Sequence, residues 1–477
     1  MNLVKRLIVL YLIVFTAFSC SKTDNTTLPT QPETYKELTI FHINDPHGKL
    51  ANFSKIKHIV DEEKKITNVL LVSSGDIFSG NPVVDNYEEK GFPMIDVMNK
   101  VGFDVSVIGN HEFDYGETIL KDRFNQSQFD WICANVDMNN SGIPEPKEFK
   151  TITVNGIKVT FLGLVETEGK DNDIIPSTHP WRVQNLSFQK YYNVIGNYLE
   201  TKENEQSDLF IALTHLGEAT DVYLANSYPI FDAIIGGHSH TIVEKTVSNT
   251  PIFQAGSNLN YLGKIKLKIS DKEIKELDYQ LIDLNSYSNF DTSIKELTDT
   301  YTESANLDEV IGYASAYHSR SQVGCFYTDA LRNEMNVDIT FQNTGGIRAD
   351  LNEGDITKRE IFTIDPFNNG SVTYTMTVGE IKNFLKESGV RIYFSGFDLI
   401  QNNDAIEIYN AENQLLNNDT NISVGLNDYI PAVYDTYFTQ PPTFLPNTTA
   451  ETIINYLYNN SSPIDYTWCN GYFQYQQ

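Results

Sequence analysis

Short runs of apolar residues alternate along most of the chain with stretches whose apolar residues recur at helical spacing. Six runs predict buried strands, and most of them end in Gly, Asn, Asp or His: ELTIFHIN (37–44), NVLLVSSGD (68–76), DVSVIGN (104–110), KVTFLGLV (158–165), LFIALTHLG (209–217) and DAIIGGHSH (232–240). Residues 51–65 and 91–102 predict helices between the strands, and residues 251–270 predict a hairpin. Such alternation predicts an α/β layered sandwich.

A second part of the chain follows an acidic stretch and has a similar mixed pattern. Residues 337–346 (VDITFQNTGG) and 371–378 (SVTYTMTV) predict strands of another α/β domain. A length of 477 residues exceeds one ordinary core and predicts two domains. We place the first domain at 36–285, the second at 310–477, and a weakly helical linker at 286–309.

The first twenty residues resemble an export signal. Two basic residues precede a mostly apolar run, 7–18, that is too short to span a bilayer comfortably. Cys20 ends an imperfect lipobox (AFSC) and is the predicted lipidation site; a plain secretory signal is the alternative. Residues 21–35 predict a flexible tether. Both interpretations place the protein outside the cytoplasm, in the periplasm or at the cell surface.

The charge of the chain narrows the choice of partners. Its 63 acidic and 35 basic residues give a net charge of −28, which repels phosphate backbones and argues against a polymeric nucleic acid. A small anionic substrate remains possible where metal ions or arginines reverse the field locally. The cysteines after Cys20 have no CxxC spacing, so they predict either one bridge, between Cys325 and Cys469, or buried free thiols.

Side chains that can bind metal gather where the predicted strands end: Asp45, His47, Asp76, Asn110, His111, His215, His238 and His240. Open α/β sheets usually bind ligands at this edge. Two residues that are two apart on an extended segment project from the same face, so each such pair can reach one site. A mixed set of nitrogen and oxygen ligands suits zinc, manganese, iron or cobalt better than calcium. The other histidines are predicted to be structural: His42, His58, His179 and His318.

Five motifs in this order resemble the blocks of the calcineurin-like metallophosphoesterases: NDPHG (44–48), GDIFSG (75–80), GNHEFD (109–114), THLG (214–217) and GGHSH (236–240). From about 38 to 435 the chain resembles the 5′-nucleotidase family, which includes UDP-sugar hydrolases and cyclic phosphodiesterases. The resemblance implies a four-layer α/β/β/α metallophosphoesterase sandwich followed by a smaller mixed α/β substrate-binding domain.

The same resemblance implies a centre of two divalent ions. Asp45, His47 and His240 would hold one ion, Asn110, His215 and His238 would hold the other, and Asp76 would bridge them. His111 is the residue that the family keeps off the metals and points at the phosphate, where an imidazolium can stabilise developing charge. Asp114 would orient that ring. Glu112 is expected to face solvent or to cap a helix.

For the second domain the resemblance implies contacts with a nucleotide. In NTGGIR, from Asn343 to Arg348, the arginine would contact the phosphate side, and Arg320 would supply another phosphate contact. Phe367 and Tyr429 would stack on the two faces of the base, and Asp435 would accept a ribose hydroxyl. The family has two glycines directly before that aspartate; Val433 and Tyr434 stand there in this chain, so we expect the loop to run differently.

The sequence therefore predicts an exported, lipid-anchored, two-metal phosphohydrolase of nucleotides, above all of nucleoside 5′-monophosphates, whose domains rotate to carry substrate to the metals. A cyclic-nucleotide phosphodiesterase, a UDP-sugar hydrolase or a hydrolase of other phosphate esters would use the same metal centre. A surface lipoprotein that binds nucleotides without hydrolysing them is the alternative from another class.

Overall fold

A computed structural model describes residues 35–170, 173–469 and 471–476. The predicted signal segment 1–20 with Cys20, and all but the last residue of the predicted tether, lie outside the described residues. The described residues from Glu37 onward form one compact unit. Among the described helices, none has both the length and the apolar character needed to cross a membrane.

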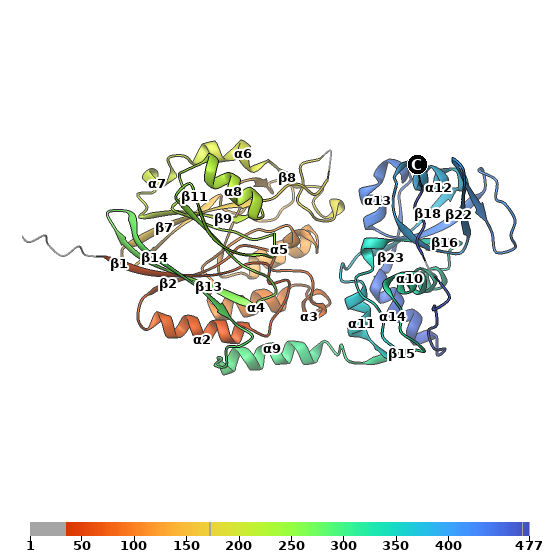
Figure 1. The fold of residues 1–477 in the computed structure, drawn as a ribbon, viewed down its shortest axis with the longest axis horizontal. Helices are drawn as coiled ribbons and strands as arrows, with labels where there is room; N and C mark the ends of the chain where they lie inside the picture. The colour runs from red at the N-terminus through yellow and green to blue at the C-terminus, as the bar shows by residue number, and fades with distance from the viewer. Residues whose placement is uncertain (1–34, 171–172, 470, 477) are drawn as a thin grey trace, which may run out of the picture. The chain divides into compact units, whose positions relative to one another are not determined.

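Two six-stranded sheets form the first part of the chain (Figure 1). The first has the order β14-β13-β1-β2-β3-β4 and comprises β1 (Lys36–Ile43), β2 (Asn68–Ser73), β3 (Val105–Val107), β4 (Asp130–Ile132), β13 (Tyr261–Ser270) and β14 (Glu273–Asp283). The second has the order β11-β12-β10-β9-β7-β6 and comprises β6 (Phe149–Val154), β7 (Ile157–Val165), β9 (Leu209–His215), β10 (Ala233–Ile235), β11 (Ile242–Val247) and β12 (Thr250–Ala255).

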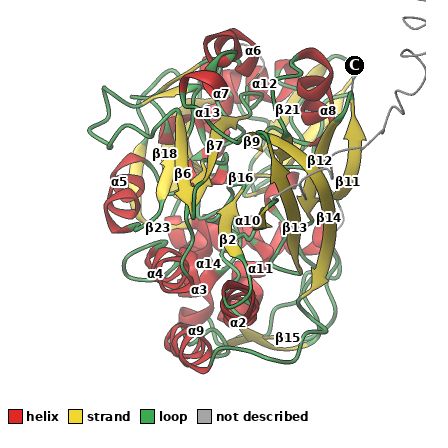
Figure 2. Cartoon of the chain, turned by 90° about the vertical axis from the view of Figure 1, so that its left-hand side faces the viewer, coloured by secondary structure: helices red, strands yellow, loops and turns green. Residues whose placement is uncertain are grey.

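Helices cover the outer face of each sheet, so the four layers are helix, sheet, sheet and helix. The cluster between the sheets consists mainly of Val, Ile, Leu and Phe side chains from strands of both. The helices of this part are α2 (Phe53–Lys64), α3 (Pro82–Asp85), α4 (Phe92–Val101), α5 (Glu117–Gln126), α6 (Tyr191–Val194), α7 (Thr201–Asn204) and α8 (Glu218–Ser227). Figure 2 shows α2 and α4 below the strands and α6 and α7 above them. This agrees with the predicted four-layer sandwich.

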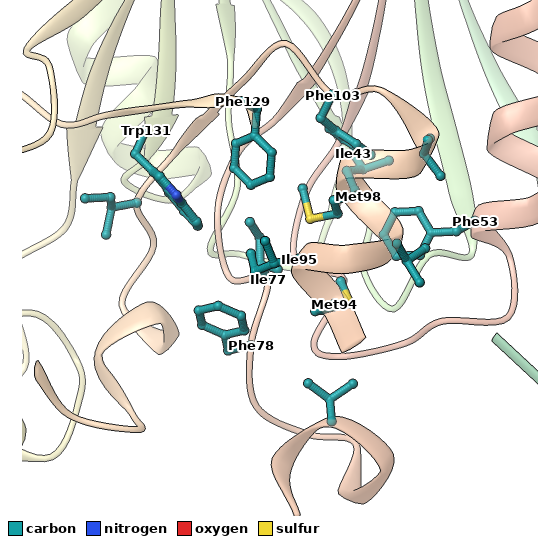
Figure 3. Close-up of a cluster of buried hydrophobic side chains, with 14 of the residues drawn as sticks. Ile43, Phe53, Ile77, Phe78, Met94, Ile95, Met98, Phe103, Phe129 and Trp131 are labelled. Atoms are coloured by element: carbon teal, nitrogen blue, oxygen red, sulfur yellow. The ribbon is translucent and has the colours of Figure 1, made fainter. Parts of the chain in front are cut away.

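Burial of one helix face explains why the predicted helices form. In α4, Ile95 and Met98 are fully buried and lie among Ile43, Phe53 and Ile77 (Figure 3). Burying one such side chain stabilises a fold by about 1.5–3 kcal/mol. The predicted helices over 51–65 and 91–102 are therefore confirmed, as α2 and α4.

The predicted hairpin over residues 251–270 is wrong. Strand β12 pairs with β10 and β11 in the second sheet, whereas β13 pairs with β1 and β14 in the first. The hairpin partner of β12 is β11, whose sequence IVEKTV is too polar on its exposed face to stand out as a strand. The segment 256–260 therefore passes from one sheet to the other.

The second part has one five-stranded sheet with helices on both faces. Its order is β19-β16-β22-β18-β23, with β16 (Ile339–Asn343), β18 (Gly370–Thr377), β19 (Ile392–Ser395), β22 (Asn421–Asn427) and β23 (Thr443–Thr448). The helices are α10 (Arg320–Met335), α11 (Lys358–Ile364), α12 (Val378–Glu387), α13 (Tyr429–Val433) and α14 (Thr449–Asn459). Helix α12 packs on the sheet through one apolar cluster. Helices α10 and α14 pack on it through another.

One further helix and three pairs of short strands lie outside these sheets. The helix α9 (Thr292–Ser304) lies between the two parts in sequence. Paired short strands are β5 (Val136–Asp137) with β8 (Ser187–Phe188), β15 (Val310–Ala314) with β17 (Gly354–Thr357), and β20 (Asp398–Asn402) with β21 (Ala405–Tyr409). Cys325 and Cys469 form a disulfide, which is the bridged alternative of the sequence prediction, and Cys133 is a buried free thiol.

Candidate active site

Parallel strands bring the predicted ligands to the same edges of the two sheets. Strands β1, β2 and β3 run parallel, and so do β7, β9 and β10, so the loops after them gather at their carboxyl ends. The seven residues lie in these loops or at the last residue of a strand: Asp45 and His47 after β1, Asp76 after β2, Asn110 after β3, His215 at the end of β9, and His238 and His240 after β10.

The ligand atoms converge in two clusters that share Asp76. One contains Asp45, His47, Asp76 and His240, and the other contains Asp76, His215 and His238; within each cluster the ligand atoms all lie within 4.8 Å of one another. The Nε2 atoms of His47 and His240 are 2.9 Å apart, and His215 Nε2 is 3.1 Å from Asp76 Oδ2. Ligands about 2.0–2.2 Å from a zinc-sized ion lie at roughly such separations from one another. The geometry thus allows two neighbouring cations with a shared carboxylate.

Asn110 belongs to the second cluster through its side-chain oxygen. Its Oδ1 lies 3.1 Å from His215 Nε2 and 3.0 Å from His238 Nδ1. Its Nδ2 donates a hydrogen bond to the Ser177 carbonyl at 3.0 Å, which fixes the orientation of the amide. His215 Nδ1 donates to the Ser74 carbonyl at 2.6 Å, so the lone pair of Nε2 faces the cluster.

The backbone at these positions is strained. Five of the seven residues have a positive φ although none is glycine: Asp45 (50°), His47 (46°), Asp76 (53°), His238 (76°) and His240 (56°). Each such residue costs about 1 kcal/mol or more, and such strain clusters at functional sites. Gly109 explains how two of the loops approach so closely, because a Cβ there would lie 2.3 Å from Asp76 Oδ1.

The charges of the clusters also suit cations. Burial alone would lower the pKa of His215, but Asp76 raises it to about 10. Burial would raise the pKa of Asp76, yet His215 and His111 hold it well below its usual range. Asp45 and Asp76 are buried carboxylates that face imidazole rings. A divalent cation bound between them would take the place of the proton on His215 Nε2, and a mixed set of nitrogen and oxygen ligands suits such an ion.

His111 and Asp114 lie beside the clusters and contact each other. His111 Nδ1 is 2.6 Å from Asp114 Oδ2, and the backbone N–H of His111 donates to Asp76 Oδ1 at 2.9 Å. Burial disfavours the imidazolium, but Asp114 and Asp76 outweigh it and raise the pKa of His111 to about 10. Thr178 Oγ1 donates to the other oxygen of Asp114 at 2.8 Å. His111 can therefore be cationic at neutral pH, with its ring fixed through Asp114.

The expectation for Glu112 is wrong, because its side chain is fully buried. Its carboxylate accepts hydrogen bonds from the backbone N–H groups of Asp76 at 2.9 Å and Ile77 at 2.6 Å, and a third from Gly109. It thus joins the loop after β2 to the loop after β3. No sequence pattern indicates this role, because the donors are backbone groups that almost any residue carries.

Glu112→Gln should lower both the stability and the metal retention of the protein. The amide keeps one acceptor oxygen but turns an NH2 group toward backbone donors, which we expect to cost about 2–4 kcal/mol of the free energy of unfolding. Thermal unfolding and metal content after dialysis measure the two effects. The exposed Glu412→Gln is the matched control, and equal metal content and melting temperature in both variants would contradict this role.

A cavity of about 430 Å³ extends from His111 and Asp114, which lie beside the metal-binding clusters, to aromatic side chains of the second part. It is lined by His111, Asp114, Glu168, Gly169, Ser177, Thr178, His179, Arg182, Asn343, Gly345, Gly346, Phe367, Asn369 and Tyr429. Phe367 and Tyr429 are 41% and 37% exposed, so each ring leaves apolar surface available within the cavity. The cavity therefore brings together His111, Asp114, Asn343, Phe367 and Tyr429 of the predicted site.

The other predicted substrate contacts lie elsewhere. The Arg348 guanidinium stacks over the Phe367 ring at 5.5 Å, and it supports this ring without lining the cavity. Arg320 begins α10, where its backbone N–H donates to Asp350, and its side chain is not part of the cavity wall.

Asp435 also lies apart from the cavity wall and pairs with Lys170 at 3.2 Å. Val433 is the last residue of α13, and Tyr434 has a φ of −103°. The chain at these two positions thus lacks the positive φ that two glycines permit.

The sequence prediction missed one wall of the cavity. Residues 166–182, which follow β7, contribute Glu168, Gly169, Ser177, Thr178, His179 and Arg182. This segment has no periodicity and no recognised motif, and His179 was predicted to be structural. The alternating prolines and polar residues around His179 indicate only a loop.

Comparison with known proteins agrees with this geometry. The family model of the calcineurin-like phosphoesterases matches residues 38–241, and that of the 5′-nucleotidase C-terminal domain matches residues 302–433. The trifunctional nucleotide phosphoesterase protein YfkN of Bacillus subtilis is 27% identical over 84% of this chain, but the chain spans only 32% of that protein. The 5′-nucleotidase of Vibrio vulnificus is 24% identical, with 83% of this chain and 85% of the relative covered.

The same fold occurs in a solved structure. The 5′-nucleotidase precursor of Thermus thermophilus superposes with a TM-score of 0.69 at 19% identity, covering 89% of this chain and 96% of the other. The chain belongs to the 5′-nucleotidase family, with a calcineurin-like phosphoesterase domain followed by a 5′-nucleotidase C-terminal domain. The part of the chain that the calcineurin-like phosphoesterase model matches contains both ligand clusters.

Proposed function

We propose that the protein releases phosphate from nucleotides, chiefly nucleoside 5′-monophosphates, outside the cytoplasm. The cavity that joins His111 and Asp114 to Phe367 and Tyr429 is the observation that carries this proposal. A nucleotide would fit this cavity. Its phosphate would lie beside His111 and Asp114, and its base would lie between the rings of Phe367 and Tyr429. The YfkN and Vibrio vulnificus relatives, whose names state nucleotide phosphoesterase and 5′-nucleotidase activities, support the same substrate class.

The proposed mechanism uses the two clusters as a paired cation site. Asp45, His47 and His240 would hold one divalent ion, and Asn110, His215 and His238 the other, with Asp76 between them. When bound, such ions supply an activated water and withdraw charge from the phosphoryl oxygens. Manganese, zinc, cobalt and iron all fit the ligand set.

Side chains around the centre would act on the substrate directly. His111 as an imidazolium donates to a phosphoryl oxygen and offsets the charge that develops there. Asp114 holds the ring in position and keeps it charged, since it contacts Nδ1. Phe367 offers the base the face that Arg348 does not cover.

The same proposal covers the organisation and location of the chain. Residues 36–285 would perform the chemistry, 286–309 would link the domains, and 310–477 would select the substrate. Export by residues 1–20 and lipidation of Cys20 would place the enzyme in the periplasm or on the cell surface. Mass spectrometry of membrane-fraction protein should then find an acylated Cys20 as the first residue.

A substrate panel tests the proposal. With manganese added, AMP should be hydrolysed with a far higher kcat/KM than 2′,3′-cyclic AMP, UDP-glucose or p-nitrophenyl phosphate. A preference for a cyclic nucleotide or for UDP-glucose would assign one of the alternative activities to the same centre. Nucleotide binding without hydrolysis of any of these substrates would favour a binding lipoprotein.

Phe367→Ala should raise the KM for AMP about tenfold, because stacking on one aromatic ring contributes roughly 1–3 kcal/mol per base. Ribose 5-phosphate lacks the base, so its KM should not change. Steady-state kinetics with both substrates measure the difference. Phe290→Ala, at an exposed ring outside the cavity, is the matched control. An equal effect of Phe367→Ala on both substrates would contradict base stacking.

A further inference from the structure

Asp428 joins the two domains at the nucleoside end of the cavity. It directly precedes α13 and is only 2% exposed. One carboxylate oxygen lies 3.1 Å from His179 Nε2, and the other lies 3.2 Å from Arg182 Nη2. Both basic side chains belong to the loop after β7, which the family comparison places in the phosphoesterase domain.

The carboxylate is held in place within its own domain. The backbone N–H of Gly370 donates to Asp428 Oδ1 at 3.0 Å, and the backbone N–H of Asp428 donates to the Gly370 carbonyl at 2.8 Å. A side chain at Gly370 would lie within 2.9 Å of the carboxylate, so glycine is needed for this approach. Asp428 therefore presents a fixed acceptor to the other domain.

The loop presents its basic groups to that acceptor. His179 Nδ1 accepts the backbone N–H of Trp181 at 3.2 Å, so the proton of the neutral ring lies on Nε2, which faces Asp428. This Nε2 is buried and has no well-aligned hydrogen-bond acceptor among the described residues, although Asp428 Oδ1 lies 3.1 Å from it. A buried donor of this kind costs free energy unless it is satisfied, which favours keeping Asp428 close.

The contact also fixes an aromatic wall of the cavity. The His179 ring packs edge-on against Tyr429, with centroids 5.8 Å apart and planes at 76°. Tyr429 directly follows Asp428 in the chain, and His179, Arg182 and Tyr429 all line the cavity. Any movement of the loop away from Asp428 would remove one side of the support for the Tyr429 ring.

We propose that His179 and Arg182 form a clasp with Asp428, and that this clasp positions Tyr429 for the nucleoside. The clasp consists of these three residues. They are positioning residues that belong to neither ligand cluster, and they determine how tightly the nucleoside part of a substrate is bound. The inference rests on the proposed nucleotide substrate.

The test compares Arg182→Gln, Asp428→Asn and the double variant with AMP and with ribose 5-phosphate. Because a charged contact of this type is lost, each single variant should raise the KM for AMP about tenfold, with kcat and the KM for ribose 5-phosphate retained. The double variant should have no larger effect than Asp428→Asn alone, since Asp428→Asn already removes the charge that Arg182 contacts. The dissociation constant of adenosine, measured by calorimetry, should rise by the same factor.

Arg359→Gln is the matched control, because Arg359 pairs with Asp308 on the surface and does not line the cavity. A lower melting temperature with an unchanged KM for AMP would reduce the contact to a structural role and overturn the clasp. Equal losses with AMP and ribose 5-phosphate, or additive losses in the double variant, would overturn it as well. If the wild-type protein hydrolyses p-nitrophenyl phosphate but no nucleotide, the proposed function itself is wrong, and the two failures are thereby distinguished.

Discussion

Asp76→Asn should reduce phosphate release from any substrate by at least about a thousand-fold, because it removes the charge that two neighbouring cations share. Asp76 is the residue common to both ligand clusters, and its side chain is 1% exposed. The asparagine has nearly the same shape, so the fold is retained while the affinity for at least one ion falls. Kinetics with added manganese and elemental analysis of the purified protein measure activity and metal content separately.

Asp308→Asn is the control for this substitution. Asp308 is exposed and pairs only with Arg359 among the described ion pairs. This variant should keep full activity and full metal content. Turnover by Asp76→Asn within about tenfold of the wild-type rate would be incompatible with a shared carboxylate between two cations.

His111→Asn should reduce kcat by about 100- to 1000-fold and leave the metal content intact, because the ring stabilises charge without being a ligand. Its own surroundings support this role, since Asp114 and Asp76 outweigh burial and raise the pKa of His111 to about 10. Asp114→Asn should have a smaller effect on kcat, because the ring remains but loses its charged partner. The KM for AMP should change little in both variants.

His58→Asn is the control for a lost imidazole, since this ring packs against Tyr287 and lies outside the cavity. It should leave kcat unchanged. If His111→Asn lost its metal ions together with its activity, His111 would be a ligand, and the assignment of a separate charge-stabilising role would be wrong.

The pattern of apolar and polar positions predicted the α/β layers of the fold and the strand ends at which the metal-binding side chains lie. The strands around Asp45, Asp76 and His215 are short apolar runs with strong contrast to the polar residues that follow. Parallel pairing then brings the polar ends together without further information. This is why residues far apart in the chain, such as His47 and His240, could be grouped from the sequence.

Local geometry at the site could not be predicted in this way. The positive φ of His238 and His240 contradicts the usual preference of non-glycine residues, and only the surrounding contacts enforce it. Glu112 joins two loops by accepting hydrogen bonds from backbone N–H groups. Because nearly every residue carries such a group, the sequence of side chains does not indicate these partners. The clasp of Asp428 with His179 depends on how two loops meet, and neither loop has a periodicity that fixes its path.

The most direct measurement is a crystal structure of the manganese-loaded protein with anomalous scattering data. We expect two anomalous peaks roughly 3.5–4 Å apart, both within reach of Asp76. One peak should be bound by Asp45, His47 and His240, and the other by Asn110, His215 and His238. A single peak, or peaks away from these side chains, would contradict the two-metal centre.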